Sequence, residues 1–199
     1  MSASNMVLRF INSLPDHRIF TTREVLHFGS RNAIDVCLFK LVKDEKIRRL
    51  ARGVFVRNDY PVKFFSITEI ALTKAASFGK KISIAGSEAA IRTGLLTREE
   101  AKKESSVVYY TTGCSSSFRS GIYRVKFISA CPRKNNLSVS KIGDFLRGYW
   151  YMGQGRIKAP LKELMRISKG MLRTERELLK KMIRIMPIWM ADELIPERK

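Results

Sequence analysis

Three consecutive side chains, Ser30, Arg31 and Asn32, have the chemistry to recognise the edges of nucleic-acid bases and the phosphates beside them. An arginine guanidinium can donate two parallel hydrogen bonds to guanine, and an asparagine amide can pair in the same way with adenine. A serine hydroxyl can contact a phosphate or cap a helix. Base contacts require that these residues stand at the start of a helix, because that end of a helix reaches base edges in the major groove.

The residues that follow predict such a helix. Ser30 can act as its N-cap, and the apolar residues beyond it recur at the spacing of one buried helical face, namely Ile34, Cys37, Leu38, Leu41 and Val42. A shorter helix precedes it, with Thr21 or Thr22 as a cap, and Gly29 is expected to end that helix by adopting a positive φ. The sequence therefore predicts two helices joined by a tight turn.

Two short strand-like runs, IRRLA and VFVR, come next and meet at Arg52-Gly53, as the strands of a hairpin would. Arg48, Arg49 and Arg52 put positive charge on this hairpin, and Lys40 adds a further cation on the second helix. We expect these four side chains and Ser30 to hold phosphates. An additional helix over residues 4–14 and a short strand at 18–21 complete the order of a winged helix-turn-helix.

The predicted fold class is α+β, with two domains. Residues 1–60 would form the winged helix-turn-helix, and the polar break at residues 58–61, which contains a proline, would separate it from an α+β domain of residues 61–199. In that second domain we expect a helix over 62–78, strands over 82–86, 106–113 and 121–130, and a Ser/Gly-rich loop before the last strand. Residues 136–199 would form a helical C-terminal part, in which Pro187 ends or kinks the last long helix.

The charge of the chain favours a polyanionic partner. Among 199 residues, 38 are Lys or Arg and 18 are Asp or Glu, which gives a formal net charge of +20. The excess runs through the whole length and no basic tail accounts for it, so folded surfaces must carry it. Hydrophobic residues make up 45% of the chain, enough for a packed core. Lys180, Lys181 and Arg184 are candidates for a second basic face on the last long helix.

Residue types that could support catalysis are present but do not form a recognisable site. His17 and His27 lack a third metal ligand nearby, and Gly153 and Gly155 lack the preceding strand of a dinucleotide-binding loop. Glu99, Glu100 and Glu104 alternate with lysines, which is typical of a solvated helix face. We therefore expect no enzyme activity, no catalytic residue, no metal and no cofactor.

Three cysteines, Cys37, Cys114 and Cys131, indicate no disulfide framework and no metal-ligand spacing. The N-terminal residues lack the apolar core of a signal peptide, and no apolar run reaches the length of a membrane-spanning helix. The expectation is a soluble cytoplasmic protein without a membrane partner, in which Cys37 belongs to the core.

The stretch from Leu38 to Phe55, L-x-K-L-x-x-x-x-x-I-R-R-L-A-R-G-V-F, resembles the N-terminal winged helix of the AbiE-type antitoxins of bacterial abortive-infection and type IV toxin–antitoxin systems. These proteins usually carry an "rGvY" ending, in which Phe55 here takes the place of the tyrosine. The run from Ala85 to Gly113 is also similar to related proteins, which pair an "aa..lGL" helix with a "vyyt.g" strand. The resemblance covers roughly residues 5–130.

This resemblance implies a function that residue spacing alone does not. It implies an N-terminal domain that binds double-stranded operator DNA, which could be an inverted repeat, and represses its own operon. It also implies a C-terminal region that counteracts a nucleotidyltransferase-like toxin without forming a stable complex with it. Two alternatives from other classes stay open: an RNA-binding accessory protein that uses its general basic surface, and a winged-helix module that docks a protein partner.

Overall fold

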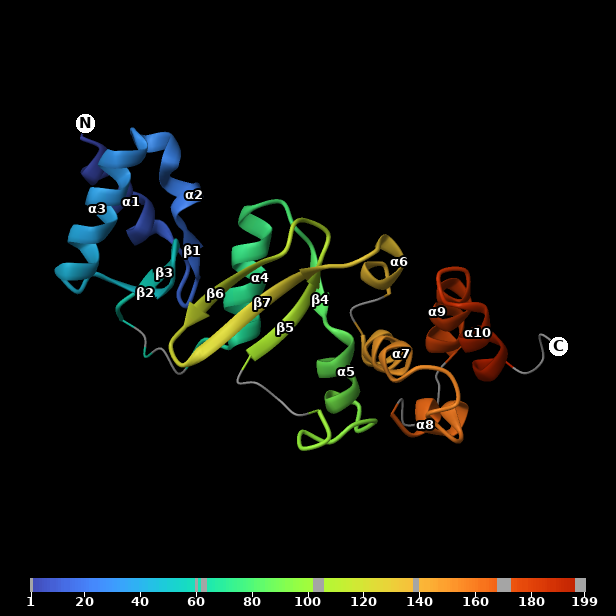
Figure 1. The fold of residues 1–199 in the computed structure, drawn as a ribbon. Coiled ribbons are helices and arrows are strands. Elements are labelled where there is room, and N and C mark those ends of the chain that lie inside the picture. Colours follow the sequence, from blue (N-terminus) through green and yellow to red (C-terminus); the bar gives the residue numbers. More distant parts are fainter. Residues whose placement is uncertain are drawn as a thin grey trace. The chain divides into compact units, whose positions relative to one another are not determined.

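The structure is a computed structural model that describes residues 2–59, 61, 64–101, 106–137, 140–167 and 173–195. The chain has a mixed α+β fold with two sheets, as predicted. It divides into two units, one made of Met1–Lys81 and Ser117–Val125 and the other of Ile82–Ser116 and Lys126–Lys199 (Figure 1). Among the described residues, no helix is both long and apolar enough to cross a membrane.

The helices and strands of the first unit follow the predicted order, and strand β6 is the one addition. They are α1 (Ala3–Ser13), β1 (Phe20–Thr21), α2 (Thr22–Val25), the 3-10 helix η1 (Leu26–Phe28), α3 (Arg31–Lys43), β2 (Ile47–Ala51), β3 (Val54–Arg57), α4 (Ile67–Ser77) and β6 (Ser116–Ser120), whose first residue counts with the second unit. The first three strands form an antiparallel sheet in the order β1-β3-β2. The predicted hairpin and its added third strand are therefore present.

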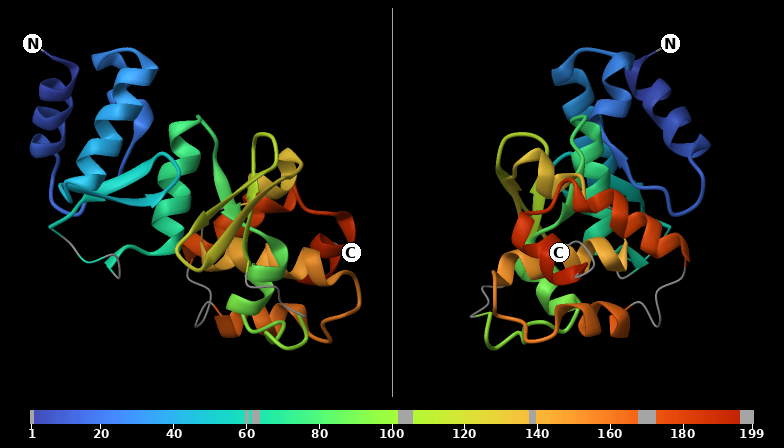
Figure 2. Two further views of the ribbon diagram at one scale, coloured as in Figure 1. Left: turned by 60° about the vertical axis from the view of Figure 1, so that its left-hand side comes forward. Right: turned by 90° about the vertical axis from the view of Figure 1, so that its right-hand side faces the viewer.

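Both faces of this sheet are buried, and by different helices (Figures 1 and 2). On one face Ile47 and Phe55 join a core with residues of α1 and α3. On the other face Val54 and Val56 pack with Ile70 of α4. Since a sheet with two apolar faces needs cover on each of them, α4 groups with the first unit.

This grouping differs from the expected division after residue 60. The N-terminal unit reaches Lys81 and takes in the segment Ser117–Val125 as well. Residue 60 of the polar break, and residues 62–63 just after it, lie outside the described residues. The independence of residues 1–60 as a domain stays a prediction.

The hairpin turn depends on a glycine. Gly53 has φ +75°, a conformation that side chains rarely adopt, and its carbonyl accepts a hydrogen bond from the backbone N–H of Thr22 at 3.1 Å. The pairing of β2 with β3 shifts between Arg49 and Ala51. Arg48 and Arg49 lie before this shift and, as successive strand residues, point to opposite faces of the sheet, so Arg48 is half-buried while Arg49 is exposed.

The expected role of Gly29 is wrong. Its φ of 174° is extended backbone and not the positive value predicted. A Cβ at this position would stand 3.1 Å from the Cβ of Ala3. The limited space beside α1 therefore explains a glycine here. Helix α3 begins two residues later, at Arg31, because Ser30 caps it.

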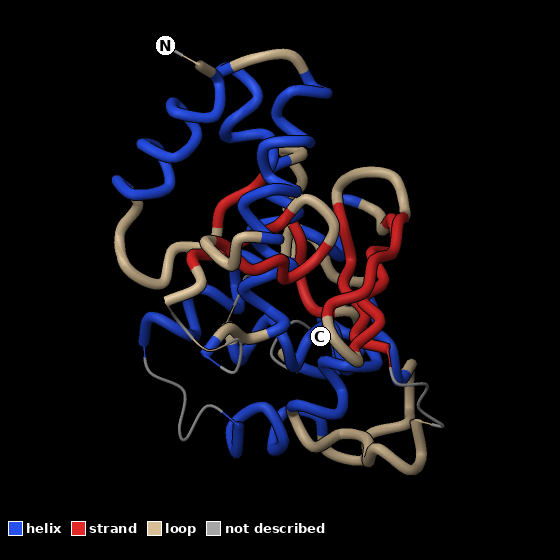
Figure 3. The backbone as a smooth tube through the Cα atoms, turned by 90° about the vertical axis from the view of Figure 1, so that its left-hand side faces the viewer, coloured by secondary structure: helices blue, strands red, loops and turns tan. Residues whose placement is uncertain are grey.

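The second unit begins with a strand and a short helix and ends in helices. Its elements are β4 (Ile82–Ile84), α5 (Gly86–Arg92), β5 (Ser106–Thr111), β7 (Tyr123–Ser129), α6 (Pro132–Asn135), α7 (Lys141–Met152), α8 (Pro160–Ile167), α9 (Arg173–Ile183) and α10 (Ile188–Leu194), where the first residues of β7 count with the first unit. The four-stranded sheet has the order β4-β5-β7-β6, and Figure 3 draws the strands in red. The last long helix is interrupted near Pro187, as predicted, but α9 already ends at Ile183, and Pro187 is the N-cap of α10.

Strand β6 corrects the predicted Ser/Gly-rich loop. Ser116 and Ser117 begin a strand here, although SSFRS lacks the β-branched residues that mark strands in a sequence. It pairs with β7, which begins at Tyr123, so the two strands form a hairpin around Gly121 and Ile122, in which Gly121 has φ +55°.

Helices α5 and α7 pack closely, and small residues permit the contact (Figure 1). A Cβ added to Gly148 would lie 2.8 Å from both the Cα and the backbone N of Ala90. Around α7, the core of the helical part contains buried Phe145, Leu146 and Tyr149. The predicted helical C-terminal part is therefore present in the described residues.

Candidate nucleic-acid interface

The residues that were predicted to contact bases lie at the N-terminus of α3. Ser30 is the N-cap, and its Oγ accepts a hydrogen bond from the backbone N–H of Ala33 at 3.3 Å, as expected. Arg31 and Asn32 occupy the first two helical positions and are exposed. The buried face of α3 is formed by Ile34, Cys37, Leu38 and Leu41, so the helix presents Arg31 and Asn32 to solvent.

Arg31 is held by a neighbour on the same helix. Its Nε donates to Asp35 Oδ2 at 2.8 Å, and the side chains are 63% and 51% exposed. Because the contact uses Nε, the two terminal nitrogens keep their N–H groups for another acceptor. The pair therefore orients the guanidinium while leaving its fork available.

The exposed face of α3 also carries apolar side chains. Val36 is 54% exposed and Phe39 is 69% exposed. Lys40, which is also exposed, adds a positive charge on the same side of the helix. Large exposed apolar groups at a charged surface are typical of contact surfaces. This face therefore combines donors, a cation and apolar area.

A groove of about 650 Å³ lies beside α3, and we call it the α3 groove. Its polar lining in the described residues contains five cations and one carboxylate: Arg23, Arg31, Arg49, Arg52, Lys74 and Asp35. Its apolar lining comes from six side chains: Leu26, Leu38, Phe39, Val42, Phe55 and Phe78. The α3 groove thus joins the start of α3, the hairpin and the end of α4 in one positively charged surface.

The structure brings together three of the seven predicted contact residues, namely Arg31, Arg49 and Arg52. Ser30, Asn32 and Lys40 remain exposed on α3 outside the groove lining, and Arg48 is half-buried opposite Val56. The position of Arg48 makes it a weaker candidate for a phosphate contact than Arg49.

Two cations of the groove were not predicted from the sequence. Arg23 Nη1 donates to the carbonyl of Ser77 at 3.0 Å, and its guanidinium lies 4.4 Å from the ring centroid of Phe78. Lys74 Nζ donates to the carbonyl of Arg52 at 2.6 Å. Neither lies near the hairpin in sequence, so only the packing of α4 on the sheet could reveal them.

The half-buried position of Lys74, and the charges around it, perturb its pKa. Burial, followed by the positive charges of Arg52 and Arg49, lowers the pKa of Lys74 below its ordinary value. The charged form of this lysine is thus destabilised in the folded protein. An anion placed here would relieve that repulsion.

The predicted second basic face has a simpler setting. Lys180, Lys181 and Arg184 are exposed at the C-terminal end of α9 and in the turn that follows. The buried residues Leu179 and Met182 anchor that helix in its own core. The three cations therefore point away from that core, as on a solvated helix.

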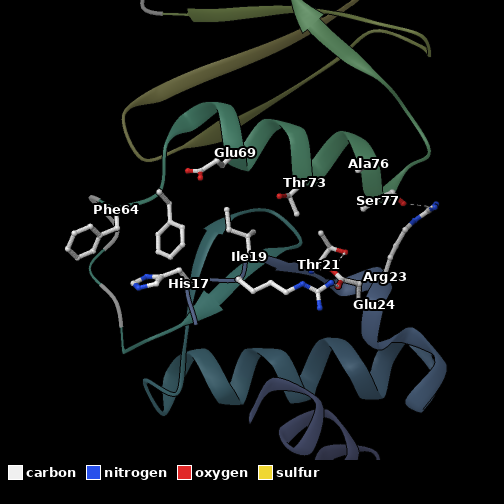
Figure 4. Close-up of a pocket in the computed structure, with 12 residues that line it drawn as sticks. His17, Ile19, Thr21, Arg23, Glu24, Phe64, Glu69, Thr73, Ala76 and Ser77 are labelled. Atoms are coloured by element: carbon white, nitrogen blue, oxygen red, sulfur yellow. Dashed lines mark hydrogen bonds and ion pairs between the residues drawn. The ribbon is translucent and has the colours of Figure 1, made fainter. Parts of the chain in front are cut away.

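A second cavity of the first unit, about 910 Å³, lies between α4 and the segment around β1 (Figure 4). Its charged groups are already engaged in the protein. Arg18 pairs with Glu24 at 2.6 Å, and Glu69 accepts hydrogen bonds from Ser66, the N-cap of α4. Its polar lining therefore serves the local fold, and it offers less free charge than the α3 groove.

The histidines have aromatic surroundings. The ring of His17 lies 6.1 Å from that of Phe64, and the ring of His27 lies 3.9 Å from that of Phe28. Within the described part of the chain, no group of three or more His, Cys, Asp or Glu side chains could hold a metal ion. Cys37 is buried in the core, as expected, while Cys114 and Cys131 are exposed.

The fold and this surface define a mixed α+β protein with a basic helix-and-hairpin face. The chain belongs to the family described as "Family of unknown function (DUF6088)", which matches residues 6–177, from α1 into α9. No curated protein and no solved structure matches it.

Proposed function

We propose that this chain is a sequence-specific DNA-binding regulator and that its N-terminal unit is a winged helix-turn-helix. The observation that carries this proposal is the α3 groove, where the N-terminus of α3 and the charged hairpin line one basic surface. In this assignment α3 enters the major groove of double-stranded DNA. The hairpin is the wing, and its Arg49 and Arg52 contact phosphates.

Three side chains of α3 suit base recognition. Arg31 keeps its terminal nitrogens for guanine, because Asp35 engages only Nε. Asn32 is exposed in the next position and can pair with adenine. Phe39 offers apolar area for a thymine methyl group. This combination supports recognition of a particular base sequence over binding to phosphates alone.

We further propose that the regulator is an antitoxin of the AbiE type, which represses its own operon and counteracts a nucleotidyltransferase-like toxin. The support is the resemblance carried by Leu38–Phe55 and by the run from Ala85 to Gly113. Coexpression tests this role: the chain should restore growth to cells that produce the toxin encoded beside it. Continued growth arrest, with the chain present and folded, would refute the antitoxin role and leave the DNA-binding role intact.

The test of DNA binding uses the full chain, its own upstream DNA, a scrambled duplex of equal length and a structured RNA across a salt series. We expect a preference for the upstream fragment that persists at about 0.15 M salt, since specific complexes typically exceed non-specific ones by about 10³-fold or more. Equal affinity for all three nucleic acids, lost as salt rises, would contradict sequence-specific binding.

A protein-docking role is the second candidate, because Val36 and Phe39 are exposed on α3. It predicts that Phe39→Ala abolishes capture of a protein partner while binding to any DNA is weak and disappears near physiological salt. The DNA-binding proposal predicts instead that Phe39→Ala lowers affinity for the upstream fragment more than for the scrambled one. The same variant therefore separates the two functions.

A further inference from the structure

A smaller hollow of the first unit, about 460 Å³ in volume, lies beside the α3 groove, and we call it the cationic hollow. The residues that line it come from the hairpin, α4 and β6: Arg49, Ala51, Arg52, Lys74, Ser117, Phe118 and Arg119. Four of them are cations, and none of these described residues is a carboxylate. Three segments that are far apart in the sequence thus place positive charge around one space.

The positions of these cations are built into the fold. Lys74 Nζ donates to the carbonyl of Arg52 and lies 5.2 Å from the ring centroid of Phe118. Phe118 in turn packs against the core formed on the α4 face of the sheet. The ammonium group is therefore held at the hollow by a carbonyl and an aromatic ring.

Strand β6 is fixed beside the hairpin by a buried hydrogen bond. The hydroxyl of Ser120 donates to the carbonyl of Leu50 at 2.8 Å, and Ser120 is only 8% exposed. This contact positions the preceding residue, Arg119, next to the hairpin arginines. Arg119 is exposed, so its charge faces solvent at the rim of the hollow.

Nothing among the described residues neutralises this charge. No described carboxylate forms an ion pair with Arg49, Arg52, Lys74 or Arg119. Like charges that lie close together without a counter-charge repel one another and destabilise the free protein. They also attract an anion. Burial is the largest cause of the lowered pKa of Lys74, and the positive charges of Arg52 and Arg49 lower it further.

We propose that the cationic hollow binds a backbone phosphate of DNA, outside the base pairs that α3 reads. The inference rests on the proposed DNA-binding function and extends it to residues beyond the helix-turn-helix and hairpin. The hollow and the α3 groove share Arg49, Arg52 and Lys74. A polymer with a phosphate at every nucleotide can occupy both spaces at once, whereas a small phosphate compound would fill one. The contact contributes affinity for any sequence and leaves base preference unchanged.

The test measures binding of the full chain to the upstream fragment and to the scrambled duplex over a salt series. Arg119→Gln should lower the slope of log K against log salt by about 1, and Lys74→Gln with Arg119→Gln by about 2, since each lost phosphate contact retains its counterions. Both duplexes should lose affinity by the same factor. The charge-matched control, Arg156→Gln with Lys158→Gln, alters one arginine and one lysine in the exposed loop before α8 and should keep the wild-type slope.

Two results would overturn the proposal. One is an unchanged slope in the double variant, provided that its melting temperature shows a folded protein. The other is tight binding of a mononucleotide or inorganic phosphate that the double variant loses while its DNA binding stays the same, which would assign the hollow to a free phosphate compound. A wild-type chain without preference for the upstream fragment would instead refute the proposed sequence specificity, while the slopes would still test the hollow.

Discussion

At the scale of single residues, the candidate interface separates side chains that can select a base from those that can only hold the backbone. Arg31 and Asn32 begin α3, and Arg52 lies in the hairpin turn. A base contact changes affinity for particular sequences, whereas a phosphate contact changes affinity for all of them. The two groups therefore call for different measurements.

Arg31→Ala should weaken binding to the upstream fragment by about 1–3 kcal/mol and relax the preference at one base position. Arg52→Gln should weaken binding to upstream and scrambled DNA alike, because it removes a phosphate contact. Titration of both variants against a set of duplexes with single base-pair changes measures the two effects. Wild-type affinity in both variants would show that α3 and the hairpin are not the DNA-binding face.

The role of Asp35, the ion-pair partner of Arg31, can be tested separately. Asp35→Asn removes the ion pair that orients Arg31 and also removes one negative charge from the α3 groove. Binding to scrambled DNA should become stronger, and the ratio of upstream to scrambled affinity should fall. Competition between the two duplexes measures that ratio. An unchanged ratio would mean that Asp35 does not position Arg31 for base recognition.

At the scale of secondary-structure elements, periodicity in the sequence predicted most helices and strands, and strand β6 is an exception. The buried face of α3 and the hairpin with its turn at Gly53 are confirmed. Strand β6 was missed, because its residues carry no strand pattern of their own. Because β6 was not predicted, Phe118 and Arg119 were not recognised as neighbours of Lys74.

The contact between α5 and α7 yields a test at this scale. Gly148→Ala should lower the free energy of unfolding by about 1–3 kcal/mol, because the new Cβ would meet backbone atoms of Ala90 that cannot move aside easily. Chemical denaturation measures the change. Lys141→Ala, at an exposed position of the same helix, is the control and should change stability little. Equal stability of both variants would contradict the close packing of these helices.

At the scale of the whole molecule, the dominant property is the net charge of +20. Such an excess opposes folding through self-repulsion and favours association with a polyanion. The cations of the α3 groove and the cationic hollow concentrate that repulsion in the first unit. Salt should therefore stabilise the free protein while it weakens the complex with DNA.

Raising the salt concentration from about 0.01 M to about 0.1 M shortens the screening length from about 30 to about 10 Å. The melting temperature of the free chain should rise, by about 2–4 °C for each kcal/mol of repulsion removed. Calorimetry across the salt series measures the shift, and Arg156→Glu with Lys158→Glu should reduce it because the net charge falls. A melting temperature that decreases with salt would mean that attractive ion pairs outweigh the repulsion.

Caps, apolar periodicity and turn residues act over a few neighbouring positions, so the local elements could be predicted from the amino-acid sequence, and its composition sets the sign of the charge. Ser30, the buried face of α3 and the glycine turn are of this kind. Which cations share a surface depends instead on how distant segments pack. Lys74 reaches Arg52 across 22 residues, and Ser120 binds Leu50 across 70, since covering the second apolar face of the sheet requires α4 and β6. Contacts of that separation depend on how whole elements pack, and no local pattern encodes them.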